Sequence, residues 1–147
     1  MNTKYFESSE GIKELLEKYS ELFTLIDDLG QQLLQGILVT VDQYREALNQ
    51  FTGAYISLEP LYSMAIAYKE NGELKFYVEK KREIEAKEGK VVSASLEKEA
   101  NFAVEELRRI RNILEGYVNA TEKGIITCQT QLKRIEADNK FKPNEEQ

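Results

Sequence analysis

Residues 94–137 carry an apolar stripe that constrains the fold more than any other part of the sequence. Apolar side chains recur there at steps of three and four residues, the spacing that gathers side chains on one side of an α-helix. The stripe, in which only Thr121 is not apolar, consists of Leu96, Ala100, Ala103, Leu107, Ile110, Leu114, Val118, Thr121, Ile125, Cys128, Leu132 and Ile135. One helix over this range would be roughly 65 Å long. Because a lone helix cannot bury such a stripe, the sequence predicts partner helices along its whole length.

The predicted fold class is all-α, an elongated helical hairpin or bundle with a long C-terminal helix and coiled-coil-like packing. Apolar residues make up 41% of the chain and charged residues 31%, proportions that suit a helical bundle. We expect one helical domain over residues 1–137, with acidic helices at 9–60, a basic and aromatic helical segment at 61–88, the long helix at 94–137 and a disordered tail at 138–147. The long helices are expected to associate between copies through Leu107, Ile110, Leu114, Val118, Ile125 and Leu132.

Local signals place the boundaries of the first helices. Ser8 or Ser9 is expected to cap a helix over residues 11–35, which Gly36 ends. Thr40 and Gln43 have the spacing of a capping box, so they are expected to start the next helix. An apolar heptad follows in Val41, Tyr44, Leu48, Phe51, Tyr55, Leu58, Tyr62 and Ala65.

Pro60, Gly72 and Gly89 are the points where the helical pattern is open to interruption. Pro60 predicts either a kink within one helix or a new helix start, and the continuing apolar register favours the kink. At Asn71-Gly72 the sequence fits a β-hairpin turn or a helix that tolerates the glycine; the helix is favoured because no other strand is available to form a sheet. Gly89 is expected to break the helix, and Ser93 or Ser95 to cap the long one.

Charge is unevenly distributed along the chain. The net charge is -6, yet residues 60–135 hold fourteen Lys and Arg against twelve Asp and Glu, whereas residues 1–59 hold four against ten. The second part is therefore the place for a nucleic-acid contact. Its basic residues lie among aromatic ones, a mixture typical of single-strand binders but also of a solvated helix face above a core. Arg108, Arg109 and Arg111 could bind phosphate, pair with glutamates of their own helix or pair with a neighbouring subunit.

The sequence offers little for catalysis. It contains no histidine, no glycine-rich phosphate loop and no nucleophile motif, so we expect no enzyme, cofactor or metal site. Asp27 and Asp28 lack further oxygen ligands at suitable spacing. Cys128 is expected to be a small core residue. A single cysteine, the absence of an apolar leader and the absence of a long apolar run predict a cytoplasmic protein without a membrane span, in the host cytoplasm if a phage encodes it.

The order of segments from Leu61 to Ala137 resembles the UvsY-type recombination mediators of bacteriophages. A segment rich in Tyr and Lys is followed by the turn Glu88-Gly89-Lys90 and then by a long terminal helix. The matching positions are Tyr68, Lys69, Leu74, Lys75, Tyr77, Lys80 and Lys81, then Ile113-Leu114-Glu115, Ala120, Ile125 and Leu132-Lys133-Arg134-Ile135.

This resemblance implies an all-helical, ring-like homo-oligomer that binds single-stranded DNA and helps a RecA-like recombinase replace a single-strand-binding protein. It assigns DNA contacts to Lys75 and to Lys80-Lys81-Arg82. Together with the arginine cluster, the expected DNA-binding residues are Lys75, Lys80, Lys81, Arg82, Arg108, Arg109 and Arg111. Such a protein would act with the recombinase and the single-strand-binding protein as partners. The alternative is a structural coiled-coil adaptor or phage assembly chaperone that binds only protein.

Overall fold

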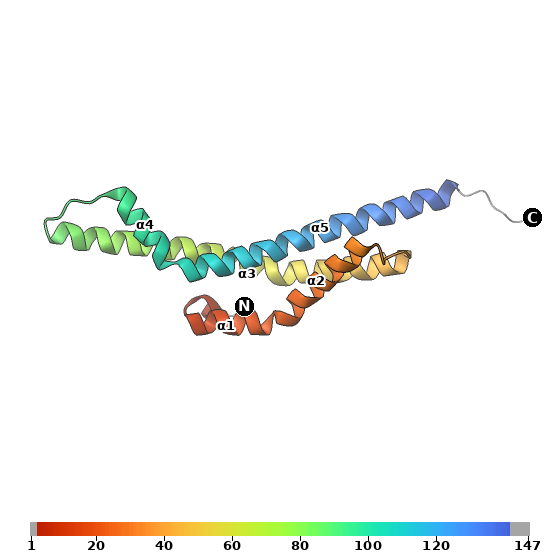
Figure 1. The fold of residues 1–147 in the computed structure, drawn as a ribbon, viewed down its shortest axis with the longest axis horizontal. Coiled ribbons are helices and arrows are strands. Elements are labelled where there is room, and N and C mark those ends of the chain that lie inside the picture. The colour runs from red at the N-terminus through yellow and green to blue at the C-terminus, as the bar shows by residue number, and fades with distance from the viewer. Residues whose placement is uncertain (1–2, 142–147) are drawn as a thin grey trace, which may run out of the picture. The chain divides into compact units, whose positions relative to one another are not determined.

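A computed structural model describes residues 3–141, and within that range every regular element is a helix (Figure 1). A short 3-10 helix, η1 (Thr3–Phe6), precedes α1 (Ser9–Lys18), α2 (Ser20–Gln35), α3 (Val41–Ala86), α4 (Ser93–Ala103) and α5 (Glu105–Phe141). The predicted all-α class is confirmed, as is a long C-terminal helix. Residues 138–141, which were expected to be disordered, form the last turn of α5. The rest of that predicted tail, residues 142–147, lies outside the described range.

The chain divides into two compact units. Unit 1 comprises Met1–Lys18 and Pro60–Glu115, and unit 2 comprises Tyr19–Glu59 and Gly116–Gln147. Each unit therefore contains one part of α3 and one part of α5. The single domain over residues 1–137 stays a prediction.

In unit 1, α3 and α5 run antiparallel. The Tyr62 hydroxyl donates to Glu115 Oε1 at 3.1 Å. Further along α3, Gly72 lies beneath Val104 and Leu107: a Cβ built at Gly72 would be 2.9 Å from Val104 Cγ1. The N-terminal segment packs onto the same pair, with the Phe6 and Tyr68 ring centroids 5.6 Å apart. Buried aromatic side chains of η1 thus extend the core of this unit.

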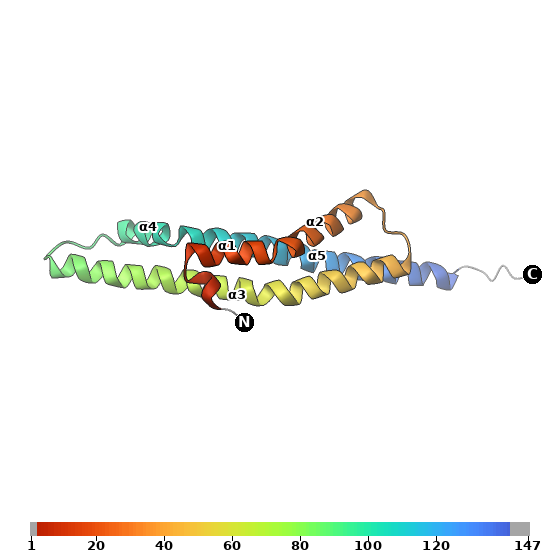
Figure 2. The ribbon, with the colours of Figure 1, turned by 90° about the horizontal axis from the view of Figure 1, so that it is seen from below.

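In unit 2, α2 packs with the first part of α3 and the last part of α5. The α3 and α5 segments lie side by side in both views (Figures 1 and 2). A close approach joins Phe51 of α3 to Gly124 of α5. The rings of Phe23 and Tyr117 stack with centroids 4.4 Å apart, and the Tyr117 hydroxyl donates to Asp27 Oδ2 at 3.1 Å. Aromatic stacking and a peripheral hydrogen bond therefore fix α2 on α5.

Several predicted helix ends are confirmed. The Ser8 hydroxyl accepts a hydrogen bond from the Gly11 N–H and caps α1. Gly36 adopts φ +66°, the left-handed conformation that ends a helix most easily with glycine. The capping box is present, because the Gln43 N–H donates to Thr40 Oγ1 at 3.2 Å while the Thr40 N–H donates to Gln43 Oε1 at 3.0 Å.

α3 runs through both positions where an interruption was considered. It continues across Pro60, so no new helix starts there, and across Asn71-Gly72, which confirms the helix over the hairpin. Its buried residues confirm the predicted heptad at Phe51, Leu58 and Ala65, whereas Ala47, Ala54 and Leu61 replace the other predicted members. Tyr44, Leu48, Tyr55 and Tyr62 are only half-buried beside this line. Small alanines at the seam let the neighbouring helices approach closely, and the larger tyrosines flank it.

Two helices predicted as continuous are interrupted. The helix expected over residues 11–35 breaks at Tyr19, which separates α1 from α2. The long helix expected over residues 94–137 breaks at Val104, whose φ of -113° and ψ of 23° are not helical. Val104 is buried there and Ala103 is exposed, so the predicted stripe was wrong at this step.

The start of α4 also differs from the prediction. Val92, not Ser93 or Ser95, occupies the N-cap of α4, and no side chain caps that end. Gly89 does follow the end of α3, as expected, and its N–H donates to the Ile84 carbonyl at 2.9 Å. The neighbouring Glu88 takes up the left-handed conformation, with φ 56°.

Candidate nucleic-acid and protein interfaces

All seven predicted DNA-binding residues belong to unit 1, on the second part of α3 and the first part of α5. They do not share one environment. Four have exposed side chains and form no ion pair with any described residue: Lys75, Lys81, Arg82 and Arg109. The other three already bind acceptors within the chain. The candidate phosphate-binding set is therefore smaller than the sequence predicts.

Arg108 is the most engaged of the three. Its Nη2 donates to the Asn101 carbonyl oxygen at 2.9 Å and to Asn101 Oδ1 at 2.7 Å. The same nitrogen lies 3.6 Å from Glu73 Oε1, which also pairs with Lys69 at 3.3 Å. Arg108 thereby links α5 to the end of α4 and to α3. Its guanidinium supports the fold at the Val104 break and is not free for phosphate.

Lys80 and Arg111 are also paired. Lys80 Nζ donates to Glu83 Oε2 at 3.0 Å, and this hydrogen bond and the Glu83 charge raise the pKa of Lys80. Arg111 Nη1 lies 3.6 Å from Glu115 Oε2, the carboxylate that accepts from Tyr62. Neutralised cations contribute little to a phosphate field.

The aromatic residues of this region serve packing. Tyr68 contacts Phe6, and Lys80 lies over the Phe76 ring at 5.9 Å from its centroid. Tyr68, Phe76 and Tyr77 are all half-buried. These contacts fit the interpretation of the aromatics as core side chains, the alternative left open by the sequence.

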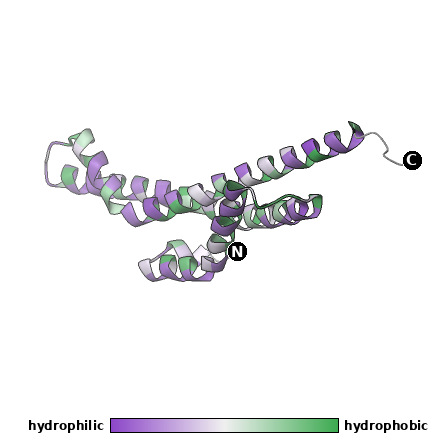
Figure 3. Cartoon of the chain, turned by 45° about the vertical axis from the view of Figure 1, so that its right-hand side comes forward, coloured by the Kyte–Doolittle hydropathy of each residue, from purple (hydrophilic) through white to green (hydrophobic). Residues whose placement is uncertain are grey.

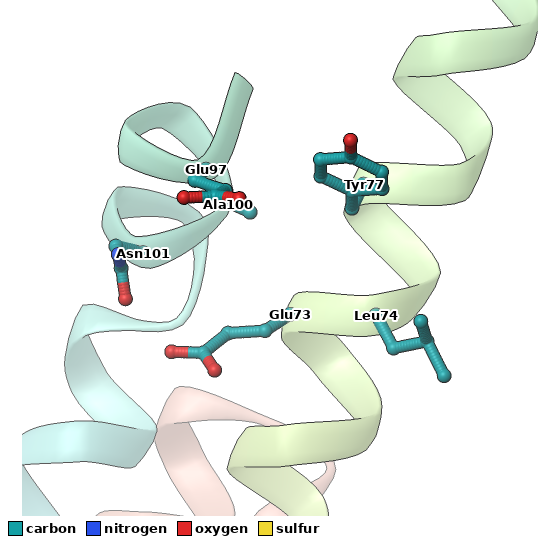
Figure 4. A pocket seen from close by; sticks show the side chains of 6 residues that line it. All are labelled: Glu73, Leu74, Tyr77, Glu97, Ala100 and Asn101. Atoms are coloured by element: carbon teal, nitrogen blue, oxygen red, sulfur yellow. The ribbon is translucent and has the colours of Figure 1, made fainter. Parts of the chain in front are cut away.

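A pocket of about 360 Å³ lies between α3 and α4 (Figure 4). Glu73, Leu74 and Tyr77 line it from α3, and Glu97, Ala100 and Asn101 line it from α4. Figure 4 shows the Glu73 carboxylate extending across the gap while Leu74 turns away from it. The pocket offers no cation to an anionic ligand, since Glu73 already pairs with Lys69 and Arg108 and Glu97 adds a negative charge. The pocket therefore adds nothing to phosphate binding.

The predicted association residues are largely used within the chain. Ile110, Leu114 and Val118 are buried in the core of a single copy, and Leu107, Ile125 and Leu132 are half-buried. Of the predicted set, only Leu107, Ile125 and Leu132 keep exposed surface for a contact between copies.

The structure identifies apolar side chains that the sequence interpretation missed. The large exposed ones are Leu34, Ile37, Val39, Ile56, Leu74, Val92, Phe102, Ile126 and Phe141. Leu34, Ile37 and Val39 cluster in sequence around Gly36, outside the apolar face of α2. Their position could have predicted this exposure, because apolar residues next to a helix-ending glycine do not belong to the buried face of a helix. Figure 3 shows the apolar residues distributed along the helices.

Comparisons with known protein families, with curated proteins and with solved structures find no match. Within residues 3–141, no group of three or more His, Cys, Asp or Glu is arranged to hold a metal ion. None of the described helices combines the length and apolar character needed to cross a bilayer.

Proposed function

We propose that this protein is a non-enzymatic, self-associating accessory protein that binds single-stranded DNA and helps a RecA-like recombinase to displace a single-strand-binding protein. The observation that carries the proposal is the group of four predicted DNA-binding residues in unit 1 that are exposed and form no ion pair with a described residue: Lys75, Lys81, Arg82 and Arg109. This group is named the cation set below.

The charge balance of the units supports this location. Unit 1 holds fourteen of the twenty Lys and Arg residues against fifteen Asp and Glu, whereas unit 2 holds six against eleven. Lys75 and Arg82 are seven residues apart on α3, so they share a helix face. Exposed Lys and Arg without internal partners are the groups that release counterions from a nucleic-acid backbone. Unit 1 is thus the less repulsive of the two units toward a polyanion.

Self-association is part of the proposal because one cation set is weak. A few cations in a nearly neutral unit give a low affinity for one short strand. Self-association would present the same strand with the cation sets of more than one copy at once, and avidity then raises the overall affinity. Acidic unit 2 would be left to contact protein partners.

The test is binding to fluorescent oligo-dT, measured by anisotropy over a range of salt concentrations. We expect affinity to fall as salt rises, with a log-log slope of about -0.7 per phosphate contact. Reversing two cations, in the Lys81→Glu/Arg82→Glu variant, should weaken binding at least about tenfold and reduce the slope by about 1.4 per copy.

A matched control separates a local site from net charge. The Lys13→Glu/Lys123→Glu variant changes the net charge equally at two exposed positions outside the cation set. It should keep most of the affinity. Absence of binding by the unaltered protein at low salt, or equal losses in the two variants, would refute the DNA proposal.

A second candidate function is supported by the exposed apolar side chains and by the pairing of Lys80, Arg108 and Arg111 within the chain. In this alternative the protein is a helical adaptor or assembly chaperone that binds only protein. Self-association with no salt-dependent DNA binding would favour it.

A further inference from the structure

Unit 2 contains a groove formed by α2, the connection at residues 36–40 and the start of α3. Its volume is about 350 Å³. Buried apolar side chains form its floor, among them Leu29, Leu38 and Ala47. Carboxylates stand at its sides: Asp28 on α2 and Glu46 on α3 are exposed and form no ion pair with a described residue. We call this feature the acidic groove.

The edge of the acidic groove is apolar and uncovered. Ile37 lines the groove and is 52% exposed, and nearby in sequence Leu34 and Val39 are 79% and 71% exposed. An apolar floor, an apolar edge and flanking carboxylates suit a helix with apolar residues on one side and cations beside them.

The end of α5 has these properties. Lys133, Arg134 and Lys140 are exposed and form no ion pair with a described residue, and Phe141 is 85% exposed. The three cations outnumber the two exposed carboxylates of the same segment, Glu136 and Asp138, so its net charge is positive. Counting along the antiparallel helices from the Phe51–Gly124 contact places Val41 opposite Arg134. Residues 135–141 therefore extend past the first residue of α3, as Figure 2 shows. We call residues 133–141 the α5 end.

We propose that two copies of this chain pair by exchanging α5 ends, each α5 end lying in the acidic groove of the other copy. A second copy is the occupant that the charges favour, because the cations of one α5 end meet the carboxylates of the other copy's groove. The α5 end cannot fill its own groove, since it continues a straight helix past the start of α3.

The arrangement closes on itself. The acidic groove and the α5 end belong to the same end of unit 2, so a twofold axis relates two identical contacts. Each apolar and ionic contact is made twice, which leaves no free groove to recruit a third copy. This inference develops the self-association in the proposed function and does not depend on DNA binding.

The test is the mass of the full chain in solution, measured by sedimentation velocity at micromolar concentration. We expect twice the 17.0 kDa of one chain. Two variants should each dissociate, with at least a tenfold weaker dimer. Asp28→Lys/Glu46→Lys makes the groove basic, and Lys133→Glu/Arg134→Glu/Lys140→Glu makes the α5 end acidic.

Mixing the two variants provides the sharpest result. The basic groove of the first then meets the acidic α5 end of the second, and the acidic groove of the second meets the basic α5 end of the first. A heterodimer should form although neither variant pairs with itself. Combining all five substitutions in one chain should likewise restore the homodimer.

Control variants distinguish this contact from effects of net charge and from non-specific hydrophobic association. Lys75→Glu/Lys81→Glu/Arg82→Glu makes the same change in net charge in unit 1 and should leave the dimer intact. Phe141→Ser should weaken the dimer, whereas Phe102→Ser, at a 78% exposed position in α4, should not. A lone 17.0 kDa species, an oligomer that neither charge variant weakens, or a failure of the mixture to pair would overturn the proposal. Because no DNA is present, such a failure is distinct from failure of the DNA proposal.

Discussion

Gly124 of α5 lies against the ring of Phe51 of α3, so closely that a Cβ at position 124 would come within 2.6 Å of Cε1 and Cζ. Phe51 is 2% exposed, so its ring is enclosed in the core. The close approach of the two helices in unit 2 therefore depends on a residue without a side chain.

Gly124→Ala should destabilise the protein. Overpacking against a buried ring costs about 1–3 kcal/mol, which exceeds the gain of at most about 1 kcal/mol from the higher helix propensity of alanine. Gly116→Ala, in the same helix, meets nothing within 4 Å and should stabilise by up to about 1 kcal/mol. Urea unfolding of both variants measures these changes; equal effects at the two positions would contradict the packing described.

Arg108→Ala should lower the free energy of unfolding by about 1–2 kcal/mol, because it removes charge-assisted hydrogen bonds to Asn101 and leaves Glu73 with fewer partners. Arg109→Ala, on the adjacent exposed position, should change it by no more than about 0.5 kcal/mol. For the affinity toward oligo-dT we expect the reverse order, with Arg109→Ala causing the larger loss. If Arg108→Ala lowers the affinity for oligo-dT more than Arg109→Ala does, after correction for the fraction of folded protein, then Arg108 exchanges its internal contacts for phosphate when DNA binds.

Stability should decline in alkaline solution. Burial, followed by the hydrogen bond to Asp27 and its charge, raises the pKa of Tyr117 above its ordinary value near 10.0. The folded state therefore holds this proton to a higher pH than the unfolded state. Its contribution is fully present below about pH 10 and is lost as pH rises through the folded pKa.

The free energy of unfolding, measured from pH 8 to pH 11.5, tests this decline. Tyr117→Phe should make the decline shallower but not abolish it, because burial also raises the pKa of Tyr55 and Tyr62. Asp27→Asn should act in the same direction by removing the negative charge. An unchanged decline in both variants would contradict the assignment to Tyr117.

Cys128 should resist thiol reagents in the folded protein. Its side chain is fully buried, and burial raises the pKa of the thiol, so little thiolate forms or reaches solvent. Absorbance with an aromatic disulfide reagent should show slow reaction in buffer and complete reaction in denaturant. A cysteine introduced by Ala120→Cys, at an exposed position of the same helix, should react within seconds. Fast reaction of Cys128 itself would mean that unit 2 opens readily.

Local chemistry made some features predictable from the sequence. The Thr40–Gln43 capping box and the end of α2 at Gly36 depend on a few adjacent residues, and both occur as expected. The helix through Asn71-Gly72 followed from the absence of strands with which a hairpin could pair.

Features that depend on contacts distant in sequence were not predictable. Val104 leaves the helical conformation where it packs over Gly72, a residue that the sequence presents only as a possible turn. In α3 the seam follows Ala47 and Ala54 instead of the tyrosines, because close helix approach favours small side chains. Likewise, only the structure shows which cations have internal partners. Arg108 and Arg109 are indistinguishable in sequence, yet one is bound and the other is exposed.

The contact between Gly72 and Val104 also bears on how this chain can change over time. The side chain of Val104 occupies the space that any other residue at position 72 would need. A larger residue at position 72 therefore requires Val104 to shift or to be replaced by a smaller residue, and we expect the two positions to covary. In related sequences that have otherwise diverged, paired substitutions at positions 72 and 104 would indicate that this helix contact is retained.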